Sequence, residues 1–103
     1  MTDKQQNERM QAMLEFESTQ PVKRFWLSFV DPTKAKGQRF LGVAIVNAGG
    51  ILSASVVAHS LGCNPGGEMA CTELDPKMVI PDKYMERLLT KKEIDLLNKT
   101  QVN

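Results

Sequence analysis

Cysteine, histidine and aromatic residues are scarce in this chain of 103 residues. The two cysteines, Cys63 and Cys71, are too few for a disulfide scaffold. The single histidine, His59, and the lack of paired Cys or His spacings argue against a zinc site. Polar residues interrupt the long uncharged stretch of residues 40–67. A membrane-spanning helix instead needs about 20 predominantly apolar residues in a row. We therefore expect no metal, no cofactor and no membrane span.

An excess of charge of one sign is also missing. The chain has 13 lysine and arginine residues against 12 aspartate and glutamate residues, a net charge of +1. A general nucleic-acid binder carries a larger positive excess, so we expect no binding to long nucleic acid. Residues 1–11 are polar and lack the apolar stretch of a signal peptide. We expect a cytoplasmic protein with reduced thiols.

The charges that are present are unevenly distributed. Residues 1–20 carry two more negative than positive charges, and residues 21–39 carry four more positive than negative charges. Residues 40–67 carry no charge. Such a stretch is typical of a strand and a helix buried on most sides, or of a surface that faces another copy of the protein.

Apolar periodicity predicts the elements of the first three quarters of the chain. Residues 5–17 have helical spacing, residues 22–30 alternate as a strand, and residues 40–46 form an apolar run of strand length. We expect these two strands to pair as a hairpin. Residues 51–61 carry a helical apolar stripe that ends at a glycine, and residues 68–74 alternate as a third strand.

The remaining residues predict helical structure. Asp82 is a candidate N-cap for a helix that bears Tyr84, Met85, Leu88 and Leu89. Thr90-Lys91-Lys92-Glu93 has the spacing of a capping box, which predicts a last turn or two of helix.

These element types predict an α+β fold. We expect a small antiparallel or mixed sheet of about three strands packed on one central helix, with N- and C-terminal helices. The chain divides into an N-terminal helical arm, residues 1–20, and a single α+β domain, residues 21–103. Such a sheet has one uncovered face and two free edges, which together with the uncharged stretch predict a homo-oligomer, most simply a dimer.

Two glycine-rich turns are candidate binding elements. Residues 47–50 join a strand to a helix. Two interpretations are open: the free backbone N–H groups bind a phosphate, or the glycines simply allow a tight turn. Residues 64–68 bring together the amide of Asn64, the bare backbones of Gly66 and Gly67, and the carboxylate of Glu68. Such a loop can approach a base or a ribose, or it can serve as a plain connection.

The first predicted strand also carries candidate ligand groups. By alternation Arg24 and Trp26 share one face, and an aromatic ring beside a guanidinium suits a nucleotide, although tryptophan equally suits a subunit interface. No spacing supplies a nucleophile with its base, so we predict a binding protein rather than an enzyme. The predicted ligand-binding residues are Arg24, Trp26, Arg39, His59, Asn64, Gly66, Gly67 and Glu68.

Residues 24–73 resemble a group of small phage and prophage proteins. The resemblance is carried by FWLSFVDP, by GQRFLGVAIVNAGG and by AHSLGCNPGGEMACTEL, of which the NPGGE turn is the most distinctive part. In size and build these proteins are similar to the viral sponge proteins that sequester nucleotide second messengers of bacterial antiphage defence. The similarity implies a protein that binds a nucleotide-derived small molecule.

Three functions remain open at this point. The leading hypothesis is sequestration of a cyclic oligonucleotide or an ADP-ribose-derived signal without cleavage, because capture needs only phosphate donors, a stacking surface and enclosure. The alternative is a small interaction or regulatory module that binds a host protein through Trp26 and the uncharged stretch. A nuclease or phosphodiesterase is less favoured, because the chain has one histidine and no metal-ligand spacing.

Overall fold

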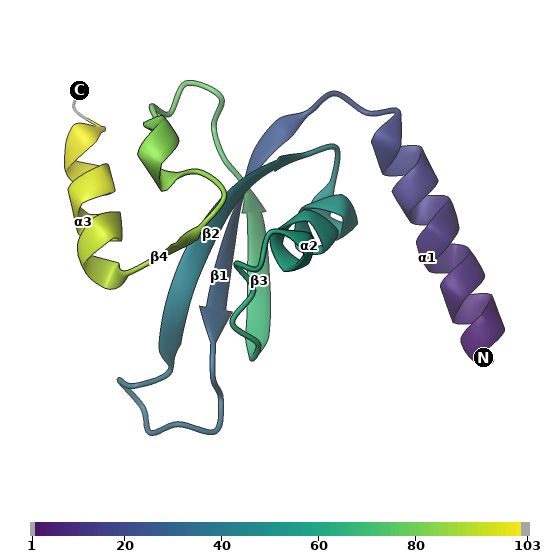
Figure 1. Ribbon diagram of the computed structural model, residues 1–103, viewed down its shortest axis with the longest axis horizontal. Helices are drawn as coiled ribbons and strands as arrows, with labels where there is room; N and C mark the ends of the chain where they lie inside the picture. The colour runs from purple at the N-terminus through teal and green to yellow at the C-terminus, as the bar shows by residue number, and fades with distance from the viewer. Residues whose placement is uncertain (1, 102–103) are drawn as a thin grey trace.

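Two long strands, β1 (Lys23–Val30) and β2 (Phe40–Ala48), form the centre of the sheet (Figure 1). The computed structural model describes residues 2–101, and in this part of the chain the sheet has four antiparallel strands in the order β3-β1-β2-β4. β3 (Glu68–Glu73) pairs with β1, and the two-residue β4 (Leu88–Leu89) pairs with β2. The predicted hairpin and the α+β class are confirmed. The sequence predicted about three strands, and the structure adds the short β4 as a fourth.

One face of the sheet, the first face, packs on a central helix. Alternation along β1 directs Phe25, Leu27 and Phe29 to this face, where all three are buried. They meet α2 (Ile51–Ser60), whose Ala54 and Ala58 are fully buried in the same core. Alanine at these two positions lets the helix lie close to the strands. The predicted central helix is confirmed.

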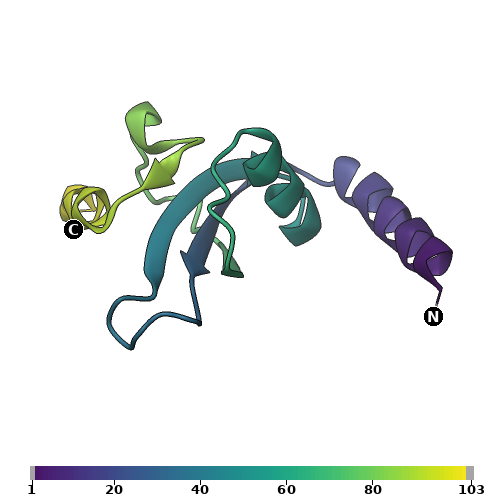
Figure 2. The same ribbon diagram turned by 60° about the horizontal axis from the view of Figure 1, so that its bottom comes forward.

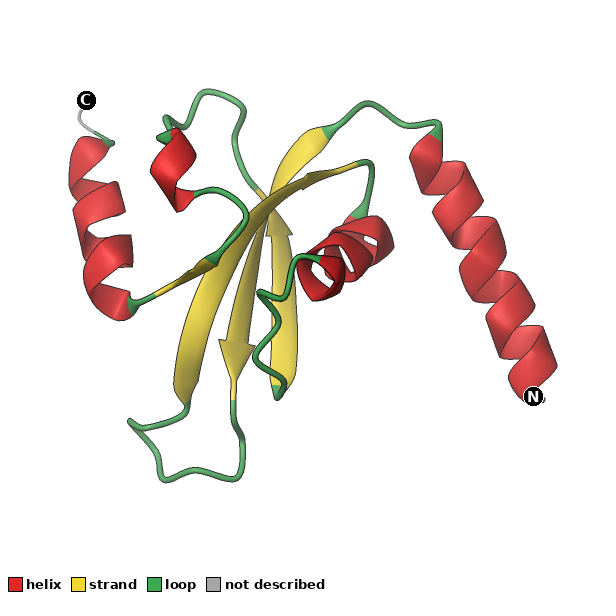
Figure 3. Ribbon diagram, viewed as in Figure 1, coloured by secondary structure: helices red, strands yellow, loops and turns green. Residues whose placement is uncertain are grey.

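The opposite face, the second face, is covered in part by the C-terminal residues, a feature that we did not predict. β4 lies beside β2 at the edge of the sheet, with the 3₁₀ turn η1 (Asp82–Tyr84) before it and α3 (Lys91–Thr100) after it in the chain (Figure 3). Val43 and Ile45 of β2 form a second buried cluster there with Tyr84, Leu89 and Leu97. The part of this face that belongs to β3 stays exposed. The expected uncovered face is therefore only half uncovered.

The predicted helix starting at Asp82 is wrong. Its first residues form only the single turn η1, and Glu86 has a φ of 63°, which breaks a right-handed helix. The Glu86 amide donates instead to the Ile45 carbonyl at 2.9 Å, and Leu88 and Leu89 then pair with β2. Long-range pairing with the sheet outweighs the local helical spacing. The capping box at Thr90 is confirmed as the start of α3.

α1 (Asp3–Ser18) projects from the rest of the molecule (Figures 1 and 2). A capping box between Thr2 and Gln5 starts it, and its last turns touch α2. Leu14 is half-buried and Glu17 is buried, while the other residues of the helix are exposed. Within residues 2–101, no helix combines the length and the apolar character needed to cross a membrane. The division into an arm and a domain stays a prediction.

Candidate functional site

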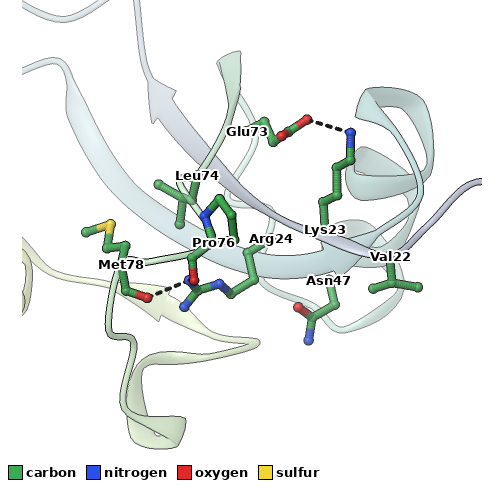
Figure 4. A pocket seen from close by; sticks show the side chains of 8 residues that line it. All are labelled: Val22, Lys23, Arg24, Asn47, Glu73, Leu74, Pro76 and Met78. Atoms are coloured by element: carbon green, nitrogen blue, oxygen red, sulfur yellow. Dashed lines mark hydrogen bonds and ion pairs between the residues drawn. The ribbon is translucent and has the colours of Figure 1, made fainter.

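A cavity of about 360 Å³ lies where the N-terminal end of β1 meets the C-terminal ends of β2 and β3. We call it the Arg24 cavity (Figure 4). Arg24 and Asn47 are direct neighbours across the β1–β2 hairpin, and both side chains lie on the second face of the sheet. The complete lining comprises Val22, Lys23, Arg24, Asn47, Glu73, Leu74, Pro76 and Met78.

Arg24 joins the sheet to the segment that follows β3. Its Nη2 donates to the backbone carbonyls of Asp75 and Pro76 at 3.2 Å and of Met78 at 2.5 Å. A guanidinium carries five N–H donors. Within residues 2–101 no acceptor lies on its Nε or Nη1, so these hydrogens remain available to an anion in the cavity. Arg24 thus has a structural role that sequence analysis missed, besides the predicted ligand role.

Of the other polar groups of the cavity, Lys23 and Glu73 are paired with each other, whereas Asn47 is exposed. Lys23 points to the other side of β1 and forms an ion pair with Glu73 at 3.3 Å (Figure 4). Both side chains are about half exposed, so the pair is screened by water and adds little to stability. Asn47 is exposed, and its carboxamide offers both a donor and an acceptor to a ligand.

A second hollow, the Trp26 groove, lies on the same face between the sheet and α3. It has a volume of about 370 Å³ and is lined by Trp26, Ser28, Phe40, Val43, Lys91, Ile94 and Asp95. Trp26 packs against the second buried cluster on one side and borders the groove on the other. The indole therefore faces a hollow, as a stacking or interface residue must.

The Asn64 turn lies at the opposite end of the sheet from Arg24. Glu68 pairs with Val30, which stands six residues from Arg24 on β1, a separation of about 20 Å at 3.3 Å per residue. Arg39 lies at this same end, where its Nε donates to the Lys34 carbonyl at 2.9 Å. The predicted ligand residues therefore do not converge on one cavity of a single protomer.

Both glycines of the Asn64 turn have structural reasons to be glycine. Gly66 has a φ of +90° and donates its amide to Asn64 Oδ1 at 2.8 Å. Gly67 has a φ of +75°, and a Cβ atom there would lie 2.2 Å from the Val30 carbonyl oxygen. The backbone conformation and the close approach to Val30 therefore account for both glycines without a ligand.

The other glycine turn is occupied by a carboxylate of the chain itself. Gly50 caps α2 without a side-chain bond, and Glu17 fills this role by accepting from the amides of Ser53 at 2.6 Å and Leu52 at 3.3 Å. Burial on its own would raise the pKa of Glu17, but the hydrogen bonds from Ser53 and Leu52 outweigh it and lower the pKa. A Cβ at Gly50 would lie 2.2 Å from Glu17 Cδ. This turn is a docking site for α1.

The two thiols and the single imidazole of the chain are not part of the lining of the Arg24 cavity. Burial raises the pKa of the thiols of Cys63 and Cys71, which disfavours the nucleophilic thiolate. His59 is exposed on α2, which lies against the first face, across the sheet from Arg24. Within residues 2–101 no three His, Cys, Asp or Glu side chains come together as metal ligands would.

Sequence analysis missed Asn47 as a site residue. Its signal is a polar residue at the end of an apolar run, but the nine-residue connection between the strands leaves the register open, so its position opposite Arg24 was not evident. No protein-family model, curated protein or solved structure matches the chain. The phage resemblance stays a prediction, and the function is argued from geometry.

Proposed function

We propose that this protein captures a nucleotide-derived small molecule, a cyclic oligonucleotide or an ADP-ribose derivative, without cleaving it. The observation that carries the proposal is the Arg24 cavity, in which a guanidinium and a free carboxamide adjoin apolar side chains. The biological setting, sequestration of an antiphage second messenger by a phage-encoded sponge protein, rests on the sequence resemblance and belongs to the same proposal.

Each part of a nucleotide has a counterpart in the cavity. The free N–H groups of Arg24 suit a phosphate, because guanidinium–phosphate bonds are charge-assisted and directional. The Asn47 carboxamide suits a base edge or a ribose hydroxyl, and Leu74 and Met78 provide apolar walls for a ring. The volume of about 360 Å³ lies at the lower end of the range for small-molecule sites, which suits one nucleotide unit.

Capture is favoured over cleavage by the state of the acidic group in the cavity. Glu73 is the only carboxylate side chain of its lining, and it is ion-paired with Lys23. A general base must lie within hydrogen-bond reach of the proton that it removes, and a charge-paired, half-exposed carboxylate is poorly suited to this role.

Binding is tested by thermal shift against cyclic dinucleotides, cyclic trinucleotides and ADP-ribose derivatives. A ligand at 100 times its Kd adds about 2.7 kcal/mol to the folded state, which raises the melting temperature of a domain of this size by about 10 °C or more. Asn47→Ala should weaken binding about tenfold, the effect of losing about one good hydrogen bond. Asn64→Ala, a matched change at the opposite end of the sheet, should leave the affinity unchanged.

Two results contradict this proposal. If no member of the panel shifts the melting temperature, nucleotide capture is wrong. If Asn64→Ala abolishes binding and Asn47→Ala does not, the ligand binds at the Asn64 turn and the Arg24 cavity is the wrong site. Chromatography of the ligand after heat release tests the absence of cleavage, since intact ligand is expected and linear or hydrolysed products would identify an enzyme.

A second candidate function is binding of a host protein, and it is favoured by the outer surface of α2. Ile51 and Val56 of this helix and Leu61 after it are exposed apolar side chains within the uncharged stretch. They are five residues apart, so they lie about 140° apart around the helix and form three separate apolar positions, any of which can contact a partner. Val56→Glu should then abolish affinity capture of the same protein that the unchanged chain retains, and equal capture by both would contradict this function.

A further inference from the structure

α1 makes few contacts within its own protomer. Of its 16 residues, Leu14 and Glu17 are at least half-buried, and both lie in the last turns. Residues 3–13 are exposed along their whole length. An isolated helix of this size is marginal in water, because nucleation is unfavourable. A stable α1 therefore requires a surface outside its own protomer.

The exposed side chains of α1 indicate the chemistry of that surface. Met10, Met13 and Phe16 are 50%, 49% and 60% exposed, and their spacing of three places them along one side of the helix. Its exposed charged side chains are three acidic ones, Asp3, Glu8 and Glu15, against Lys4 and Arg9, because Glu17 is buried. A matching surface is thus an apolar groove with basic surroundings.

The Trp26 groove has these properties. Trp26 and Phe40 provide aromatic walls, and Phe40 is 43% exposed. Lys91 and Asp95 of α3 line the groove with opposite charges, and Lys92 follows Lys91. The loop that precedes Phe40, residues 31–39, adds Lys34, Lys36 and Arg39 against a single acidic residue.

Geometry and charge point to a second copy of this chain. α1 and α3 lie at opposite ends of the molecule, so α1 cannot reach the groove of its own protomer (Figures 1 and 2). Pairing of α1 with α1 of another copy would bring together two helices whose exposed side chains each carry one negative charge in excess, whereas the loop of residues 31–39 that precedes Phe40 carries two positive charges in excess.

We propose that two copies of this chain exchange their α1 helices, with Met13 and Phe16 of one copy in the Trp26 groove of the other. A two-fold arrangement occupies both grooves and closes the assembly as a dimer. The Arg24 cavity is not part of this contact, so the proposal stands or falls separately from nucleotide capture.

Light scattering on the full chain, without added nucleotide, tests the exchange. We expect a mass of twice 11.5 kDa at micromolar concentration. Met13→Glu on α1 and Phe40→Glu in the groove should each raise the dissociation constant about tenfold or more, as central interface residues do. An equimolar mixture of the two variants should associate more tightly than either alone, because one intact α1 then meets one intact groove. Val79→Glu, a change at a side chain 61% exposed outside both surfaces, should have no effect.

Any one of the following outcomes overturns the exchange. They are a monomer at all concentrations, a dimer that Phe40→Glu leaves intact, and a mixture that associates no better than its components. A wild-type monomer whose α1 binds another protein also overturns it. If circular dichroism shows that Phe40→Glu does not fold, Lys91→Glu takes its place. Lys91 is exposed, so this substitution reverses a charge of the groove without disturbing the core.

Discussion

Glu17 joins α1 to α2 through a hydrogen bond with Leu52, which is 35 residues further along the chain. Its carboxylate provides the N-terminal cap that α2 lacks, and its side chain occupies the space in which a Cβ of Gly50 would lie. Among residues 2–101 it is the only buried charged residue, with 8% of its surface exposed. A buried carboxylate is tolerated here because backbone donors and the positive end of the helix dipole compensate for its lost hydration.

Replacing Glu17 by alanine should lower the free energy of unfolding by about 1–2 kcal/mol, the usual cost of a lost cap. Glu17→Gln keeps the length and one acceptor oxygen, so it should lose less. Because the native pKa of Glu17 lies below the ordinary value of 4.5, the carboxylate stabilises the fold above pH 4.5. This contribution is lost as the pH falls through the native pKa. Urea unfolding should show a smaller difference between wild type and Glu17→Gln at about pH 3 than at about pH 7.

Alanine substitutions at Gly66 and Gly67 separate the free-energy cost of a left-handed backbone from the cost of a steric clash. Both have a positive φ, but only the Gly67 position has a neighbour within 3 Å, the Val30 carbonyl oxygen. Gly66→Ala should cost about 1 kcal/mol of unfolding free energy for the left-handed backbone alone. Gly67→Ala should cost about 2 kcal/mol or more, because Val30 must also move. Equal losses in denaturant titrations would show that the β1–β3 contact relaxes freely.

At the scale of an element, α3 depends on its first turn. Thr90 accepts from the Glu93 amide, and Glu93 accepts from the Thr90 amide and from the Arg87 guanidinium. The bond from Arg87, followed by that from the Thr90 amide, lowers the pKa of Glu93 to about 2. This turn positions Leu97 in the cluster that covers the second face.

Thr90→Ala should lower the free energy of unfolding by about 1 kcal/mol through loss of the cap. Glu93→Gln should destabilise the chain in a pH-dependent way. The native pKa of Glu93 is about 2 against an ordinary value of 4.5, so its contribution is complete above pH 4.5 and is lost as the pH falls toward 2. Thermal unfolding followed by circular dichroism should show the gap between wild type and Glu93→Gln closing over this range. High salt should also narrow the gap, because the Arg87 pair is solvent-accessible.

At the scale of the whole molecule, the C-terminal residues are a cover held at two points. Arg24 holds the segment after β3 through three carbonyls, and Gln101 bonds to both backbone groups of Val79. Between these points lie η1, β4 and α3, which complete the second core cluster. The cover is therefore fastened to the end of the sheet that carries the Arg24 cavity.

Arg24→Ala should release the start of this cover and accelerate proteolytic cleavage at residues 75–81. The core on the first face does not include Arg24, so strand content should remain. Arg39→Ala is the matched control, because Arg39 holds only the loop between β1 and β2. Limited proteolysis with mass spectrometry locates the cuts. Equal cleavage of residues 75–81 in both variants would contradict the anchoring role of Arg24.

Local patterns in the sequence determined most of the elements. Alternation in residues 22–30, the apolar run at residues 40–46 and the helical stripe of residues 51–61 all act over short range, and each predicted element is present. The capping box at Thr90 located the start of α3 for the same reason, since a cap is a contact between residues three apart. The alternation that placed Arg24 and Trp26 on one face also follows from the backbone alone.

The tertiary structure alone decided the fourth strand, the covered second face and the grouping of the site residues. Leu88 and Leu89 have helical spacing to Tyr84 and Met85, yet they form strand β4. Pairing with β2 outweighs the local preference for a helix. The contact of Glu17 with α2 and the position of Asn47 opposite Arg24 depend on residues that are 36 and 23 positions apart. Periodicity indicates which face of its element a residue occupies. Which other element packs against that face depends on contacts between residues far apart in the sequence. For this reason the sequence indicated binding groups, and the structure divided them between the two ends of the sheet.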